Sequence, residues 1–290
     1  MRMEEINEFI EAQLQAWPMA HANYIALGAT ERRRFRLGDF EGAVQFNPAR
    51  IRSTGADVSK EAVRQRACFL CKENRPKEQT TMLEMEGYEM ILNPYPIFPV
   101  HFTIPLLKHE PQDEFPLEMA AFAEKFPQLA IFFNGAKAGA SAPDHAHMQA
   151  VLKTELPIVA LTERLHPATE GGIKSSDEFG ADLPFRYWSA VISPDLDGMK
   201  ALAELPTLVP DRELVNAYFW ISDGGLLRAV VIPRRAHRPA CYFDQDEEKR
   251  RMVSPGAVDM AGIIVVPRRE DFERLTDEEI ARIYRECGMQ

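Results

Sequence analysis

The segment from Asn134 to Gln149 carries the residue types most suited to chemistry in this chain. It reads Asn-Gly-Ala-Lys-Ala-Gly-Ala-Ser-Ala-Pro-Asp-His-Ala-His-Met-Gln, with two histidines and a glutamine at alternate positions. Side chains of a strand alternate between its two faces. We therefore expect His145, His147 and Gln149 to share one face, with Met148 packed on the other.

The loop before this strand, residues 135–144, consists largely of glycine, alanine and serine. Backbone amides of such small residues can approach an anion closely. A neutral imidazole is a nucleophile toward phosphorus, so His147 is predicted to attack an α-phosphate and form a nucleotidyl-histidine. Gln149 would donate a hydrogen bond to a phosphate oxygen as charge develops on it. The alternative is a pair of surface or edge-strand histidines with no partner, because short motifs often match by chance.

A second feature is the C-x-x-C pair formed by Cys68 and Cys71, a short chelate loop typical of zinc sites. Tetrahedral zinc needs two more nitrogen or sulfur ligands, and His109 and His145 are the candidates in the same half of the chain. Two alternatives stay open. One is a redox-active dithiol, although no strand–helix–strand context is evident. The other is a pair of ordinary buried thiols.

The elements around these residues predict an α+β fold. Helical spacing of apolar residues indicates helices over 4–17, 114–126 and 197–205, and a terminal helix after Thr276. Short apolar runs indicate strands over 43–46, 82–93 with a break at Gly87, 98–105, 129–134, 147–152, 187–192, 215–222, 226–233 and 260–267.

The chain also divides into segments. We expect an N-terminal helical extension over 1–40, a first half over 41–164, a polar linker over 165–185 and a second half over 186–290. The halves share a faint echo, since Ile-Pro-Leu-Leu-Lys-His at 104–109 resembles Ile-Pro-Arg-Arg-Ala-His at 232–237. This favours a duplicated half-domain.

Composition sets limits on function. The 290 residues include 34 Lys+Arg and 44 Asp+Glu, which gives a net charge of −10 and argues against a nucleic-acid partner. Four cysteines do not form a disulfide scaffold. We find no signal-peptide pattern and no apolar run of about 20 residues, so we expect a cytoplasmic protein that does not bind membranes.

In their order along the chain, these motifs resemble galactose-1-phosphate uridylyltransferase and its relatives in the histidine-triad (HIT) superfamily. Those relatives include diadenosine tetraphosphate phosphorylase and GDP-L-galactose phosphorylase. The resemblance is strong over residues 45–152 and weaker over 185–275. It implies two tandem HIT-like halves, each an antiparallel sheet with flanking helices. It departs from the uridylyltransferases in having His-Ala-His rather than His-Pro-His, and the charged loop 244–251 has no counterpart in them.

The resemblance also implies roles for individual residues. One structural zinc ion would be bound by Cys68, Cys71, His109 and His145. His147 would be the nucleophile and Gln149 would contact the phosphate. The substrate-binding residues implied in the same way are Arg50, Arg52, Asn93, Asn134, Lys137, Gly139 and Ser141. We expect His21, His101 and His166 to be ordinary surface or loop residues, and His237 to be structural or a minor anion contact.

The predicted function is therefore that of a nucleotidyltransferase or phosphorylase. It would take a nucleotide from a nucleoside diphosphate sugar or a dinucleoside polyphosphate and pass it to phosphate or a sugar phosphate. The alternatives are a HIT-type hydrolase, with water as the acceptor, and a zinc-stabilised nucleotide-binding protein without catalysis. We expect a monomer or homodimer.

Overall fold

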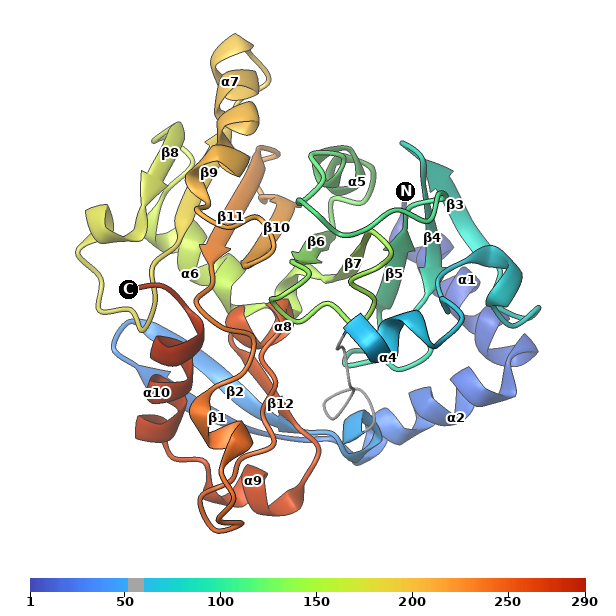
Figure 1. Cartoon of the computed structure of the whole chain (residues 1–290). Helices are drawn as coiled ribbons and strands as arrows, with labels where there is room; N and C mark the ends of the chain where they lie inside the picture. Colours follow the sequence, from blue (N-terminus) through green and yellow to red (C-terminus); the bar gives the residue numbers. More distant parts are fainter. Residues whose placement is uncertain (52–59) are drawn as a thin grey trace.

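The computed structural model describes residues 1–51 and 60–290, and its central element is a nine-stranded antiparallel sheet (Figure 1). The strands lie in the order β3-β4-β5-β7-β6-β10-β11-β9-β8. Their bounds are Thr81–Met85 (β3), Tyr88–Leu92 (β4), His101–Pro105 (β5), Leu129–Asn134 (β6), His147–Leu152 (β7), Gly172–Ser175 (β8), Trp188–Ile192 (β9), Val215–Ile221 (β10) and Leu227–Pro233 (β11).

Two antiparallel sheets, one from each half of the chain, meet edge to edge in this arrangement. The junction is the pairing of β6 with β10, in which Asn134 lies opposite Asn216. The α+β class and the antiparallel sheet in each half are therefore confirmed. The sequence did not show that the two sheets join into one, because the pairing of β6 with β10 is a long-range contact.

The β3–β4 hairpin illustrates how local sequence determines structure here. Its turn places Glu86 at φ 52° and Gly87 at φ 78°. A two-residue turn with positive φ at both positions matches the twist of the strands that it joins, and glycine adopts such φ values without strain. The predicted interruption at Gly87 is thus a tight turn.

A smaller sheet of three strands contains β1 (Glu31–Leu37), β2 (Phe40–Phe46) and β12 (Ile263–Val266). Two predictions are corrected by it. The extension predicted as helical over 1–40 ends in a strand, and the strand predicted over 260–267 pairs in parallel with β2 instead of joining the sheet of the second half. All four residues of β12 are buried, so its apolar sequence gives no indication of which sheet it joins.

The segment predicted as a linker, 165–185, contains the edge strand β8, which pairs with β9. Because β8 is short and only half-buried, its apolar pattern is too weak to predict a strand. His166 lies in the same segment and is fully buried, with Nδ1 2.9 Å from Ser189 Oγ and Nε2 2.6 Å from the carbonyl of Glu170. The prediction that His166 is a surface or loop residue was wrong.

Helices cover the sheets. They are α1 (Met3–Ala16), α2 (Pro18–Ala26), α4 (Lys60–Arg64), α5 (Met119–Lys125), α6 (Pro157–Leu165), α7 (Leu196–Glu204), α8 (Ala257–Met260), α9 (Arg269–Arg274) and α10 (Asp277–Cys287). Pro18 ends α1 and begins α2, where its missing N–H is not needed. The predicted terminal helix is α10, and Thr276 caps it together with Glu279.

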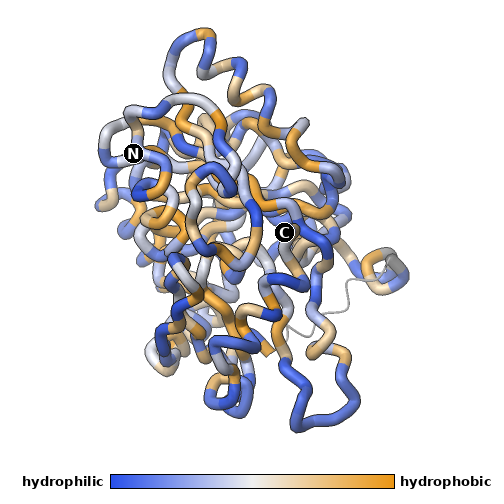
Figure 2. Tube along the Cα trace, turned by 90° about the vertical axis from the view of Figure 1, so that its left-hand side faces the viewer, coloured by the Kyte–Doolittle hydropathy of each residue, from blue (hydrophilic) through white to orange (hydrophobic). Residues whose placement is uncertain are grey.

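The nine-stranded sheet separates two apolar cores. One core contains Phe102 of β5, Ile131 of β6 and Met148 of β7, and α1 and α5 pack against it. The other core lies between the sheet and the layer formed by the small sheet, α8 and α10 (Figure 1). In Figure 2, the apolar stretches run mainly through the interior and hydrophilic residues predominate on the outlying turns. Within the described residues, no helix combines the length and the apolar character needed to span a bilayer.

Candidate active site and metal centre

The second face of β5, β6 and β7 borders a cavity of about 560 Å³. His147 and Gln149 of β7 both line it, while Met148 between them is buried in the opposite core. The predicted alternation is thus correct for these three residues. His145 is different, because it precedes the strand in a turn that its N–H closes on the carbonyl of Ala142. Its side chain faces two thiols, not the cavity.

Hydrogen bonds determine which nitrogen of His147 is available for chemistry. Nδ1 lies 2.8 Å from the carbonyl oxygen of His145, and because a carbonyl oxygen only accepts, Nδ1 must carry the proton. Burial lowers the pKa of His147 to about 4, so the ring is neutral near pH 7 and Nε2 has a free lone pair. The buried Gln112 accepts a hydrogen bond from the backbone N–H of His147 and donates one to the carbonyl of Asn134, which joins the ends of β6 and β7.

His101 holds the amide of Gln149. The backbone N–H of Ile97 donates to His101 Nδ1 at 3.1 Å, so the proton of the neutral ring is on Nε2. Nε2 lies 2.9 Å from Gln149 Oε1 and donates to it, which leaves the Gln149 NH₂ as the free end of that amide. His101 is only 1% exposed. The prediction that it is a surface or loop residue was wrong, because β5–β7 pairing buries it beside Gln149.

The buried ring of His101 leads to a prediction about acid stability. Burial lowers the pKa of His101 from 6.5 to about 3. Between these two pH values, the imidazole is therefore protonated in the unfolded chain and neutral in the folded chain. Its contribution to stability is complete above pH 6.5 and falls by about 1.4 kcal/mol per pH unit between 6.5 and 3. In His101→Gln, urea unfolding across this range should show a shallower loss of stability than in the wild type. Parallel curves for the two proteins would contradict this account.

Most of the predicted substrate-binding residues line the same cavity. Asn93, Asn134, Gly139, Ser141 and Arg50 are all among its lining residues. Arg50 donates to the carbonyl of Tyr95 at 2.7 Å, and burial lowers its pKa to about 10.

Of the other two predicted residues, the structure describes only Lys137. Lys137 forms an ion pair with Glu213 and does not line the cavity, which corrects its expected place in the site. Arg52 lies outside the described residues.

Gly139 allows the two halves to approach each other. Its φ is +102°, and an added Cβ would lie 2.6 Å from the Cα of Gly256. Beside it, Asn134 Oδ1 accepts a hydrogen bond of 2.6 Å from the N–H of Ala257. The loop predicted to bind phosphate therefore packs directly against the segment that precedes α8.

Gly139→Ala is expected to reduce the free energy of unfolding by about 1–3 kcal/mol, through backbone strain and overpacking. It should also weaken ligand binding, because the cavity wall must move. Gly171→Ala is the matched control, since an added Cβ there meets no atom within 4 Å. Chemical denaturation of both variants measures the difference, and equal effects would contradict the packing argument.

Several residues that line the cavity were not predicted from the sequence. Arg66, which shortly precedes the C-x-x-C pair, donates to the carbonyl of Ser141 at 3.0 Å, and its guanidinium lies 4.6 Å from the ring centre of Phe69. Arg238 and Ser254 enter from the second half, together with His237. The apolar part of the wall is made by Trp17, Met19, Phe69, Leu70, Ile91, Tyr95, Ile97 and Phe132. The cavity thus combines cationic groups with an apolar surface, as a nucleotide site requires.

Beside the cavity, Cys68, Cys71, His109 and His145 place one sulfur or nitrogen atom each within 4.8 Å of one another. The sulfur of Cys68 lies 3.2 Å from His145 Nδ1, and that of Cys71 lies 3.1 Å from His109 Nδ1 and 3.6 Å from His145 Nδ1. Bond lengths of about 2.3 Å to sulfur and 2.1 Å to nitrogen give edges of about 3.6 Å in a zinc tetrahedron. The cluster has the donors and nearly the spacing of such a site.

The second nitrogen of each histidine supports this assignment. His145 Nε2 lies 2.7 Å from the carbonyl of Leu106 and must donate to it, so its Nδ1 has the lone pair that a metal needs. His109 Nε2 faces Asp144 at 3.8 Å. Burial, together with Cys68, raises the pKa of Cys71 to about 11, so this thiol stays protonated near pH 7 unless a cation is bound. These four residues therefore fit a zinc ion.

Residues 9–152 match a family described as a domain of unknown function (DUF4922). No curated protein matches the sequence. The structure is similar to that of yeast Ap4A phosphorylase Apa2, with a TM-score of 0.60 and 14% identity, covering 94% of each chain.

The same yeast enzyme in complex with Ap4A gives a TM-score of 0.58 and 14% identity, covering 94% of this chain and 97% of that one. In complex with AMP it gives 0.56 and 15%, covering 93% and 96%. The similarity extends over both halves. The chain therefore shares the fold of this yeast enzyme over most of the length of both proteins.

Proposed function

We propose that this chain is a nucleotidyltransferase or phosphorylase that transfers a nucleotide through a covalent intermediate on His147. The observation that carries the proposal is the Nδ1-protonated, neutral ring of His147 in the wall of a cationic cavity, with Nε2 left unprotonated. Nε2 attacks the α-phosphorus, a P–N bond forms, and the P–O bond to the leaving phosphate breaks with its electron pair on that oxygen. An oxygen of the acceptor then attacks the same phosphorus and releases His147.

Other residues stabilise the negative charge in this scheme. The NH₂ of Gln149 is directed by His101 and donates to a non-bridging oxygen. The guanidinium groups of Arg50 and Arg66 line the cavity and balance the phosphate charge. Cys68, Cys71, His109 and His145 would bind a zinc ion, which would supply structural rigidity to the turn that leads into β7.

The comparisons support a choice among substrates. The yeast enzyme with the same fold is an Ap4A phosphorylase solved with Ap4A and with AMP. We therefore infer that a dinucleoside polyphosphate is the donor and inorganic phosphate the acceptor, ahead of a nucleotide sugar and a sugar phosphate.

The test uses purified protein and a dinucleoside tetraphosphate labelled at the α-phosphorus. Without phosphate, we expect an acid-labile, base-stable adduct on one histidine. With phosphate, the label should appear in the nucleoside diphosphate. Label in the monophosphate, with no response to phosphate, would instead indicate the hydrolase alternative. Binding without adduct or turnover across dinucleoside polyphosphates and nucleotide sugars would reject the proposal in favour of a non-catalytic protein.

A further inference from the structure

The cavity has a second polar wall, which the transfer step at His147 does not use. His237 and Arg238 follow β11, Ser254 precedes α8, and all three line the cavity. They belong to the second half of the chain, whereas His147 and Gln149 belong to the first. The cavity therefore has polar groups from both halves.

The three side chains form one connected group. Arg238 Nε donates to Ser254 Oγ at 2.9 Å, and the same oxygen lies 3.0 Å from His237 Nε2. The guanidinium of Arg238 also lies over the ring of Tyr242, with 4.3 Å between its central carbon and the ring centre. Stacking and the Nε hydrogen bond fix the plane of the guanidinium, whose fork of N–H groups suits phosphate oxygens.

The buried guanidinium of Arg234 links the segment after β11, which carries Arg238, to the segment before α8, which carries Ser254. Arg234 is 3% exposed, and its Nη2 donates to the carbonyls of Ala236, His237 and Pro255 at 2.9, 3.3 and 3.1 Å. The first two carbonyls precede Arg238 in the chain, and the third directly follows Ser254. Arg234 therefore fixes the distance between Arg238 and Ser254 in the absence of a ligand. Such preorganisation lowers the entropy lost on binding.

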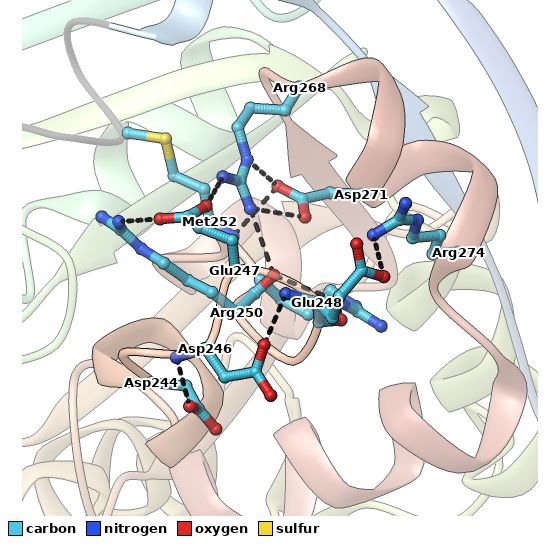
Figure 3. A network of polar contacts seen from close by, with 10 residues as sticks. Asp244, Asp246, Glu247, Glu248, Arg250, Met252, Arg268, Asp271 and Arg274 are labelled. Atoms are coloured by element: carbon cyan, nitrogen blue, oxygen red, sulfur yellow. Dashed lines mark hydrogen bonds and ion pairs between the residues drawn. The ribbon is translucent and has the colours of Figure 1, made fainter.

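The charged loop 244–251 forms a network of polar contacts with Arg268, Asp271 and Arg274 (Figure 3). Arg268 forms two hydrogen bonds to Asp271, at 2.8 and 2.9 Å, and also donates to the carbonyl of Arg250. Asp271 accepts from the N–H of Met252, two residues before Ser254. This network anchors the segment that carries Ser254. The charged loop therefore has a structural role.

We propose that His237, Arg238 and Ser254 form a second phosphate subsite, which binds phosphoryl oxygens other than those of the phosphorus attacked by His147. The role of this subsite in a reaction rests on the proposed function. Three guanidinium groups line the cavity, those of Arg50, Arg66 and Arg238, of which Arg66 also pairs with Asp144 at 3.4 Å. The single carboxylate among the described lining residues is Asp259, so this lining carries more cationic than anionic groups and suits a polyanion. Asp259 already accepts hydrogen bonds from the backbone N–H groups of Gly256 and Val265.

Binding of inorganic tripolyphosphate, measured by calorimetry, tests the subsite without catalysis. One charge-assisted hydrogen bond corresponds to about 10- to 100-fold in affinity. We expect Arg238→Gln to weaken binding by at least about 10-fold, and Ser254→Ala to weaken it less. Arg235→Gln removes the same charge from an exposed neighbour that does not line the cavity and should bind like the wild type. Wild-type affinity in both Arg238→Gln and Ser254→Ala, or no binding by the wild type, would overturn the proposal.

The phosphoryl oxygens have two possible sources, which the half-reactions separate. If the subsite binds the distal phosphates of the donor, Arg238→Gln slows adduct formation from a dinucleoside tetraphosphate. If it binds the acceptor, the variant requires more inorganic phosphate to discharge a preformed adduct. No change in either step would contradict a role in this reaction. If the wild type forms no adduct but tripolyphosphate binding still depends on Arg238, the subsite stands and the proposed transfer fails.

Discussion

His147→Ala is expected to abolish the nucleotidyl adduct and to reduce nucleotide transfer by about 10⁴-fold or more, because no other group replaces a missing nucleophile. The hydrogen bond from Nδ1 to the carbonyl of His145 makes Nε2 the attacking atom. In the described residues, the other cavity-lining imidazole is that of His237, and its Nε2 is engaged with Ser254. The measurement is the yield of labelled adduct together with kcat.

The controls for this variant separate chemistry from folding. His21→Ala removes an exposed imidazole on α2 and should retain full activity. Tripolyphosphate binding by His147→Ala should stay within about 3-fold of the wild type, because Arg50, Arg66 and Arg238 remain. Normal adduct yield in His147→Ala would contradict the assignment of the nucleophile.

Cys68→Ser is expected to remove the bound zinc and to lower the free energy of unfolding by about 4 kcal/mol or more. The ligands come from three separate segments, since Cys68 and Cys71 precede β3, His109 follows β5 and His145 lies two residues before β7. The metal would therefore close a long loop next to His147. Elemental analysis and urea denaturation measure the two effects, and chelation of zinc from the wild type should reproduce the loss of stability.

Cys241→Ser is the matched control for the metal site. Cys241 is a half-buried thiol packed against the core and is not one of the four clustered ligands. Its replacement should leave the zinc content unchanged and alter stability by less than about 1.5 kcal/mol. Purified wild type without metal, or equal metal content in Cys68→Ser, would contradict the zinc assignment.

Local sequence was sufficient to predict much of the site. Alternation along β7 correctly separated His147 and Gln149 from Met148, because a strand obeys a two-residue period wherever it lies. The C-x-x-C spacing similarly located two of four clustered metal-ligand candidates. Both signals arise within a few residues, so they do not depend on how the rest of the chain folds.

The errors came from contacts that neighbouring residues do not encode. His101 was predicted to be an ordinary surface or loop residue. The pairing of β5 with β7, in which Thr103 lies opposite Gln149, instead brings it beside Gln149. Lys137 had the right charge for a phosphate, but Glu213, 76 residues later, pairs with it. A residue's partner, burial and direction all depend on these long-range pairings.

The sequence by itself determined the strands other than β1 and β8, the metal-ligand candidates and the histidine that we propose as nucleophile, because these follow from short-range periodicity and spacing. Only the tertiary structure decided that two half-sheets join at β6 and β10, and that β12 lies beside β2. It also decided that Arg238 and Ser254 face the cavity of His147. Burial of apolar surface drives these pairings, and it is non-directional, so the apolar pattern shows which residues are buried but not which partner buries them.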